Sequence, residues 1–172
     1  NASGVMTGKN IPTTFGKEDV IWEVPVLGEG NSSPIISGLN VYVTAAQFNS
    51  ETKKGVRTLS AFSLDTGELE WKYEAPFTTY KTNKRNGFAS STPCADTQGV
   101  YVFWQSEEGS VLLAFDHDGK ERWQYEVGQF GAGTGAATSP IVHEGRVLLS
   151  HDNEKYESFL LAVSSESGTR EW

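Results

Sequence analysis

A cluster of basic side chains is the first group in the sequence that could bind a ligand. Two short segments, residues 53–57 and 80–86, contain six of the 14 lysines and arginines of a chain whose net charge is −8. Such a local excess of cations could bind the carboxylate or phosphate groups of a small anion or of a protein partner. The alternative is that these side chains are solvated loop tips, because runs of charge usually face water. The candidate ligand-binding residues of this group are Lys53, Lys54, Tyr80, Lys81, Lys84 and Arg85.

A second candidate group combines an imidazole, a carboxylate and an amide in the segment His151-Asp152-Asn153. Trp104 is the first residue of another expected connection, over residues 104–110, and adds an aromatic surface, so these four residues are further candidates for ligand binding. The histidines show no His-x-x-x-His spacing, and the single Cys94 has no Cys or His partner at zinc-ligand spacing. We therefore predict neither a metal site nor a catalytic residue.

Two glycine-containing segments resemble ligand-binding motifs without fulfilling them. Residues 131–135, Gly-Ala-Gly-Thr-Gly, lack the strand before and the helix after that a dinucleotide-binding loop needs. Residues 116–119, Asp-His-Asp-Gly, lack the further oxygen ligands and the distal Glu of a calcium loop. We interpret the first as a flexible connection and the second as an Asx-type turn. His117 and His143 then fall in short turns, where we expect them to be solvated.

The elements that must position these side chains repeat along the chain. Four tryptophans recur at intervals of 49, 52 and 49 residues, and a glycine stands four positions before each of the last three. Ser-Pro or Thr-Pro motifs recur as well, and each is followed by a glycine turn and a run of β-branched or aromatic residues. This pattern predicts short strands. The repeated positions are Trp22, Trp71, Trp123 and Trp172, with Gly67, Gly119 and Gly168.

Each repeat predicts four short antiparallel strands joined by hairpins. Four-stranded repeats of about 40 to 50 residues are typical of the blades of a β-propeller. A β-sandwich would not need the same tryptophan in each copy, and a parallel β-helix has much shorter repeats. We therefore predict an all-β, partial β-propeller with a leader over 1–19, a lone outer strand over 20–27, and blades over 28–75, 86–127 and 134–172.

The repeated sequence motifs resemble those of the PQQ-like, or quinoprotein dehydrogenase-like, β-propeller repeat family. The resemblance covers residues 22–172 and rests on Ser-Ser-Pro, on Gly-x-x-Val-Tyr-Val and on Leu-x-Ala-x-x-x-x-Thr-Gly-x-x-x-Trp. It implies that the tryptophan of the outer strand docks one blade onto the next. The positions that match this structural role are Trp22, Trp71, Trp123 and Trp172, with Gly67, Gly119 and Gly168.

The resemblance also implies a cellular location and an incomplete ring. Similar repeats occur in PQQ- and calcium-dependent alcohol dehydrogenases, in the outer-membrane assembly lipoprotein and in other exported bacterial proteins, so a periplasmic or extracellular location is implied, but no particular chemistry. Rings of this family hold about seven or eight blades. We therefore expect the remaining blades to come from the same polypeptide or from another chain, and the 172 residues alone not to form a cooperatively melting monomer.

Composition excludes two classes of partner. With 22 acidic against 14 basic residues, the chain is too acidic for a dedicated nucleic-acid binder, whose affinity depends on neutralising phosphates. No apolar stretch approaches the length that membrane insertion requires. We therefore predict no binding to nucleic acid and no membrane insertion.

The functional hypothesis follows from the geometry of a blade. Connections from the second to the third strand, and from one blade to the next, emerge on one face of the disc, and variable loops on a rigid repeat scaffold tend to contain the binding residues. These connections are predicted over residues 46–58, 75–90, 104–110, 127–137 and 150–158. We predict a non-catalytic binding or scaffolding propeller that needs no cofactor and engages a protein or a small anionic ligand at this face.

Two alternatives stay open. The chain could be part of a PQQ- and calcium-dependent quinoprotein dehydrogenase, for which Asp152, Asn153 and Trp104 match in type only; the vicinal cysteine pair of that group is absent, since Cys94 stands alone. It could also be the extracellular sensor module of a larger protein, which nothing in this segment separates from the first hypothesis.

Overall fold

Three antiparallel β-sheets make up the structure, a computed structural model that describes residues 13–131 and 133–172. The first twelve residues of the predicted leader lie outside the described part, and the leader's remainder contains a short 3-10 helix, η1, over Lys17–Asp19. The first sheet consists of β1 (Ile35–Ser37), β2 (Asn40–Asn49), β3 (Lys54–Ser63) and β4 (Leu69–Thr78). The second consists of β5 (Cys94–Ala95), β6 (Val100–Gln105), β7 (Ser110–Phe115) and β8 (Glu121–Gly128), and the third of β9 (Ile141–His143), β10 (Arg146–His151) and β11 (Phe159–Ser164).

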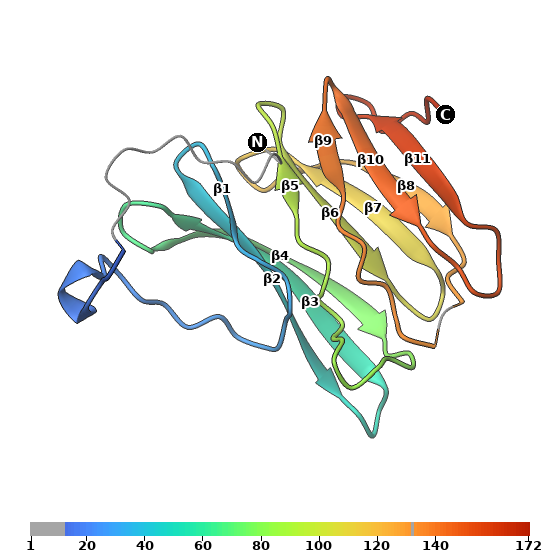
Figure 1. Ribbon diagram of the computed structural model, residues 1–172, viewed down its shortest axis with the longest axis horizontal. Coiled ribbons are helices and arrows are strands. Elements are labelled where there is room, and N and C mark those ends of the chain that lie inside the picture. The colour runs from blue at the N-terminus through green and yellow to red at the C-terminus, as the bar shows by residue number, and fades with distance from the viewer. Residues whose placement is uncertain (1–12, 132) are drawn as a thin grey trace.

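The arrangement confirms the prediction of an all-β, partial β-propeller. Each sheet is ordered as along the chain, and the three sheets stand side by side with the short strands β1, β5 and β9 adjacent to one another (Figure 1). A fourth strand begins beside β11, where the Ala162 amide donates to the Trp172 carbonyl (3.0 Å) and the Glu171 amide to the Ala162 carbonyl (2.9 Å). All three units therefore follow one pattern.

Glycine turns set the register of the hairpins. At the β9–β10 turn, His143 pairs with Arg146 across Glu144 and Gly145, which both have positive φ angles, 47° and 73°. A two-residue type I′ turn requires this backbone, and its twist matches that of the flanking strands. The β7–β8 and β3–β4 turns likewise contain a glycine of positive φ, Gly119 and Gly67.

The second sheet is buried on both sides because it lies between the other two. Every residue of β6 is buried, whereas exposed and partly covered residues alternate along most of the outer strands β4 and β8. One core cluster, containing Tyr42 and Phe115, joins the first and second sheets, and another, containing Tyr101 and Leu161, joins the second and third. Burial of a single large side chain of this kind stabilises the fold by about 1.5 to 3 kcal/mol.

Residues 20–27 do not form the predicted outer strand. The structure assigns no regular element to them, because no strand among the described residues runs beside them to accept or donate backbone hydrogen bonds. The chain joins the first sheet only at Glu29, which exchanges two 2.8 Å backbone hydrogen bonds with Ala46 of β2.

Two of the predicted long connections are instead short hairpins. Strands β2 and β3 pair as far as Asn49 and Lys54, so only residues 50–53 form the loop where 46–58 was expected. Strand β6 continues through Gln105, and only residues 106–109 form the next hairpin loop. The prediction that Trp104 lies in an irregular connection is therefore wrong: its side chain is packed in the core between the first two sheets, stacked on Tyr73.

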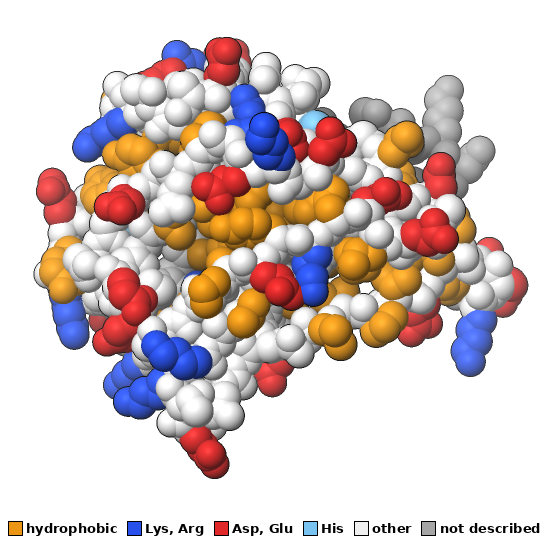
Figure 2. Space-filling view, turned by 180° about the vertical axis from the view of Figure 1, so that it is seen from behind, with side chains coloured by type: hydrophobic (Ala, Val, Ile, Leu, Met, Phe, Trp, Pro, Cys, Tyr) orange, Lys and Arg blue, Asp and Glu red, His pale blue; other side chains and the backbone are white. Residues whose placement is uncertain are grey.

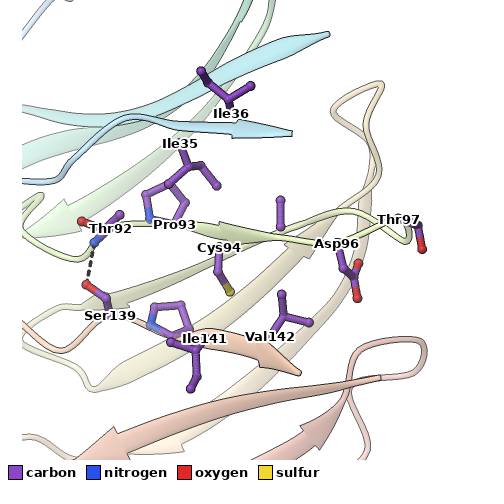
Figure 3. A pocket seen from close by; sticks show the side chains of 12 residues that line it. Ile35, Ile36, Thr92, Pro93, Cys94, Asp96, Thr97, Ser139, Ile141 and Val142 are labelled. Atoms are coloured by element: carbon purple, nitrogen blue, oxygen red, sulfur yellow. Dashed lines mark hydrogen bonds between the residues drawn. The ribbon is translucent and has the colours of Figure 1, made fainter. Parts of the chain in front are cut away.

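The repeated Ser-Pro and Thr-Pro motifs lie at the inner edge of the sheets, beside β1, β5 and β9, where they connect one sheet to the next. The Ser33 amide donates to the Thr92 hydroxyl, and the Thr92 amide donates to the Ser139 hydroxyl, both at 3.0 Å. Figure 3 shows the second of these bonds beside a groove of about 710 Å3 that runs along β1, β5 and β9. The residue before each proline thus has the same structural role in successive units.

Candidate binding face

The loops leave the sheets at two opposite ends. The β2–β3, β6–β7 and β10–β11 loops and the connections over residues 79–93 and 129–140 lie at one end, the lower edge of Figure 1. We call this end the loop face. The β1–β2, β5–β6 and β9–β10 turns and the glycine turns lie at the other, which we call the hairpin face. Figure 2 shows Lys and Arg side chains gathered around the projecting end of the first sheet, at the loop face.

Three depressions mark the loop face and contain six of the candidate residues. The first, which we call the hairpin pocket, has a volume of about 640 Å3 and is lined by residues that include Lys53, Tyr80 and Lys81. The second (about 380 Å3) includes Arg85, and the third (about 520 Å3) includes Asp152 and Asn153. The other candidates lie elsewhere: Lys54 and Lys84 are exposed outside these depressions, and Trp104 and His151 are buried.

The three depressions lie in one row, in which the second and third are continuous and the hairpin pocket is their neighbour. The second and third share Thr134, Gly135 and Ala137 as lining residues. Tyr80 of the hairpin pocket lies against the same segment, since a Cβ atom placed on Gly135 would be 3.2 Å from the Tyr80 ring. The row therefore extends from the first sheet to the third.

Arg57 fixes the connection that forms the wall of the hairpin pocket. Predicted to join the exposed cationic cluster, it is instead only 3% exposed, because β3 directs it between the first two sheets. Its Nε donates to the Phe88 carbonyl (2.6 Å), its Nη2 to the Gln105 carbonyl and, at 3.4 Å, to the Tyr80 hydroxyl. Its guanidinium lies 4.0 Å above the Phe77 ring. Burial lowers the pKa of Arg57 to about 10, so the group stays charged at neutral pH.

His151 lies beneath the third depression rather than on its surface. Its ring is enclosed by Phe103, Phe130 and Phe159 and is 2% exposed. Nδ1 lies 3.0 Å from the Asn153 amide nitrogen and accepts its hydrogen bond. Nε2 has no hydrogen-bond partner within the described residues. His151 is therefore buried and cannot contact a ligand directly. Its side chain forms a hydrogen bond with Asn153 instead.

Asn153 holds the neighbouring connection in place. Its side-chain oxygen accepts from the Gly131 amide (2.7 Å), and its side-chain nitrogen donates to the Gln129 carbonyl (3.2 Å) as well as to His151. The β10–β11 loop and the connection over residues 129–140 are thereby joined through one amide. Position 153 thus shapes the third depression, which the sequence alone did not indicate.

Protonation of His151 should destabilise the fold. Burial lowers its pKa below the ordinary value of 6.5, so the unfolded chain binds a proton at a higher pH than the folded chain. The free energy of unfolding should therefore fall as the pH decreases from about 6.5 through the lower folded-state pKa. Chemical denaturation at several pH values would measure this fall. His151→Phe should remove it, whereas the exposed His143→Gln should retain it; identical slopes in all three proteins would contradict the prediction.

His117 is a contact residue that sequence reasoning missed. Expected to be solvated, its ring instead joins the first two sheets: Nδ1 accepts from the Tyr42 hydroxyl (2.8 Å), and Nε2 donates to the Asp96 carbonyl (2.9 Å). The only signal in the sequence was its place in the turn that precedes Trp123. That position in the repeat contacts the preceding sheet.

The repeated tryptophans and glycines meet across neighbouring units. A Cβ atom on Gly119 would lie 2.5 Å from the Trp71 indole, and one on Gly168 would lie 2.6 Å from the Trp123 indole. The Trp71 indole N–H donates to the His117 carbonyl (2.8 Å), and that of Trp123 to the Ser165 carbonyl (3.1 Å). Trp22 contacts Gly67 and the Leu64 carbonyl in the same way, and Trp172 is 53% exposed.

The residues that match a quinone and calcium site in type are not brought together in the described part of the chain. No group of three His, Cys, Asp or Glu side chains comes together within residues 13–131 and 133–172. Trp104 is packed in the core of the first two sheets, whereas Asp152 and Asn153 lie beside the third. Burial raises the pKa of the Cys94 thiol, which therefore stays protonated at neutral pH. Among the described helices, none has the length and hydropathy to cross a membrane.

Comparison with known proteins assigns the family. The family model described as "Outer membrane protein assembly factor BamB" matches residues 16–172. The chain belongs to this family of PQQ-like β-propeller repeats. A search of the curated proteins gives no match for this propeller chain.

Solved structures show the same propeller fold at low sequence identity. A europium-containing methanol dehydrogenase matches with a TM-score of 0.56 and 19% identity, covering 86% of this chain and 25% of its own. BamB from Moraxella catarrhalis matches with 0.54 and 18%, covering 87% and 41%. A quinohemoprotein alcohol dehydrogenase from Comamonas testosteroni matches with 0.51 and 19%, covering 84% and 21%. The PQQ-like chain thus spans less than half the length of each of these structures.

Proposed function

We propose that this PQQ-like propeller is a non-catalytic binding or scaffolding element that engages a protein partner through its loop face. The observation that carries the proposal is the row of three neighbouring depressions, whose walls are fixed from below by the buried Arg57 and by Asn153. A rigid scaffold with shaped, polar loops suits recognition, because little conformational entropy is lost on binding.

The family assignment supports a scaffold as the class of function. The matching family model is described as an outer membrane assembly factor, and one of the similar structures is a BamB protein. We propose that this chain has a similar scaffolding role and holds a protein partner. We also propose that it is exported, because such a role requires that location.

The dehydrogenase alternative lacks an observation of its own in the described residues. Likeness to two dehydrogenases below 25% identity shows a shared fold, which does not transfer chemistry. The residues once considered for a quinone and its calcium are divided between two sheets. The sensor alternative predicts the same binding face and differs only in what else the polypeptide contains.

A crosslinking scan of both faces tests the proposal. A photoreactive amino acid is placed at Lys84 or Glu154 on the loop face, and at Leu39 or Thr97 on the hairpin face; all four positions are exposed. We expect one defined protein adduct from the loop-face positions and none from the other two. Adducts from the hairpin face alone, or from neither face, would overturn the proposal.

A further inference from the structure

The β2–β3 hairpin projects beyond the rest of the loop face. β2 and β3 each have 10 residues, whereas β6 and β7 of the second sheet each have 6. The added length places Phe48 opposite Gly55, and it places the loop over residues 50–53 above the connection that follows β4. The Thr79 amide donates to the Lys53 carbonyl (2.9 Å), which fixes the loop to that connection. The hairpin pocket lies between them.

An aromatic cluster forms the wall of the hairpin pocket. Phe48 and Phe88 meet edge to face with centroids 4.8 Å apart, and Tyr80 meets Phe88 in the same geometry at 5.1 Å. Phe48 is 42% exposed although its ring is large and apolar. Aromatic side chains that remain open at the surface while held by neighbours are the usual anchors of binding sites.

The polar groups of the hairpin pocket favour an acceptor. Arg57 donates to the Tyr80 oxygen, so the Tyr80 hydroxyl proton is free to be donated elsewhere. Burial raises the pKa of Tyr80, so that proton is retained at neutral pH. Lys53 and Lys81 add two amines, and neither forms an ion pair within the described part of the chain. Glu107 is the one carboxylate that lines the pocket.

Lys53 has a backbone conformation that a lysine rarely adopts. Its φ is 55°, in the left-handed region that favours glycine, and such positions persist at functional sites at a cost in stability. The hairpin loop therefore keeps a lysine in the lining of the pocket at a position where a glycine would be less strained.

We infer that the hairpin pocket binds a segment of the partner protein that presents an aromatic or branched aliphatic side chain next to an aspartate or glutamate. The apolar side chain would lie against Phe48 and Phe88, and the carboxylate would accept from Lys53, Lys81 and the Tyr80 hydroxyl. An extended polypeptide fits better than a small acid, because the second depression begins on the other side of Tyr80, whose ring packs against Gly135, so a chain that crosses Tyr80 reaches both. This inference rests on the proposed function and specifies the chemistry of its partner.

Selection from a displayed library of random linear peptides tests the inference. The protein is immobilised, and enriched peptides are titrated against Lys53→Gly, Lys81→Gln, the second-depression variant Arg85→Gln and the matched hairpin-face control Lys120→Gln, which should leave binding unchanged. We expect enriched peptides to contain an aromatic or branched residue within two positions of an acid, and to bind about tenfold more weakly to the first two variants. Lys53→Gly should melt at the same temperature as the parent or higher, because glycine relieves the strained φ.

Four outcomes would decide against it in different ways. Peptides without an acid, or binding unaffected by Lys53→Gly and Lys81→Gln, would overturn the pocket assignment. If those peptides respond to Arg85→Gln instead, the loop face still binds and only the pocket inference fails. If no loop-face variant changes binding, the proposed function fails as well. Displacement of the peptides by phenylacetate at equal concentration would show a small-acid site and overturn the extended segment.

Discussion

In the assembled propeller, substitution of Gly119 by alanine should lower the melting temperature by about 6–12 °C. The new Cβ atom would lie 2.5 Å from the Trp71 indole, so the ring must shift and the contact between the first two sheets must open. Overpacking of this kind costs about 1–3 kcal/mol, and the positive φ of 85° adds about 1 kcal/mol for any residue with a Cβ. At roughly 2–4 °C per kcal/mol, a total of about 3 kcal/mol gives the predicted fall.

Gly145 provides the matched control. Its φ is 73°, and a Cβ atom there would meet nothing within 4 Å. Gly145→Ala should therefore show only the backbone cost, about 1 kcal/mol. A scanning calorimetry measurement in which both variants fall equally would contradict a docking role for the Trp71–Gly119 contact.

Replacement of Arg57 by methionine should destabilise the fold by about 3 kcal/mol. The change removes the donors of the buried Gln105 carbonyl and of the partly buried Phe88 carbonyl, and an unpaired buried acceptor costs about 1–3 kcal/mol. Methionine fills most of the volume, which offsets part of this loss. Thermal unfolding measures the effect, and the connection over residues 79–93 should lose protection from hydrogen exchange before the sheets do.

Arg122 is the control for this prediction. Arg122 donates to three backbone carbonyls, those of Gln98, Ser165 and Glu166, where Arg57 donates to two, but Arg122 lies on the hairpin face and is partly exposed to water. Arg122→Met should cost about 1 kcal/mol, because water can replace the lost donors. Equal losses of unfolding free energy in the two variants would show that burial is not the reason why Arg57 stabilises the fold.

The repeat pattern predicted the fold because each blade must satisfy the same local rules. Trp71 and Gly119 are spaced by the repeat, so their contact follows from copying one unit against the next. Which side chains are buried could not be predicted from the repeat pattern in the same way. Arg57, Trp104 and His151 are polar or aromatic residues near expected loops, and only the packing of the second sheet between its neighbours places them inside.

The candidate face was predicted in part for a related reason. Alternation of hairpins put Lys53, Tyr80 and Lys81 at one end, since strand direction alone decides which loops share a face. The number of paired residues in β2 and β3 was not predictable, because it depends on which cross-strand pairs find support from the neighbouring connection. Asn153 was a candidate for ligand contact, but its role in joining two loops depends on distances that only the fold supplies.

One measurement tests whether the loop face is the binding surface. It is the dissociation constant of the partner found by crosslinking, measured with two matched double variants of this protein. Lys84→Ala with Arg85→Ala removes two exposed cations from the loop face, and Lys120→Ala with Arg170→Ala removes two from the hairpin face, so the net charge changes equally. We predict that the first pair weakens binding by about tenfold and that the second leaves it unchanged. Equal effects of the two pairs, or a loss only with the second pair, would contradict binding at the loop face.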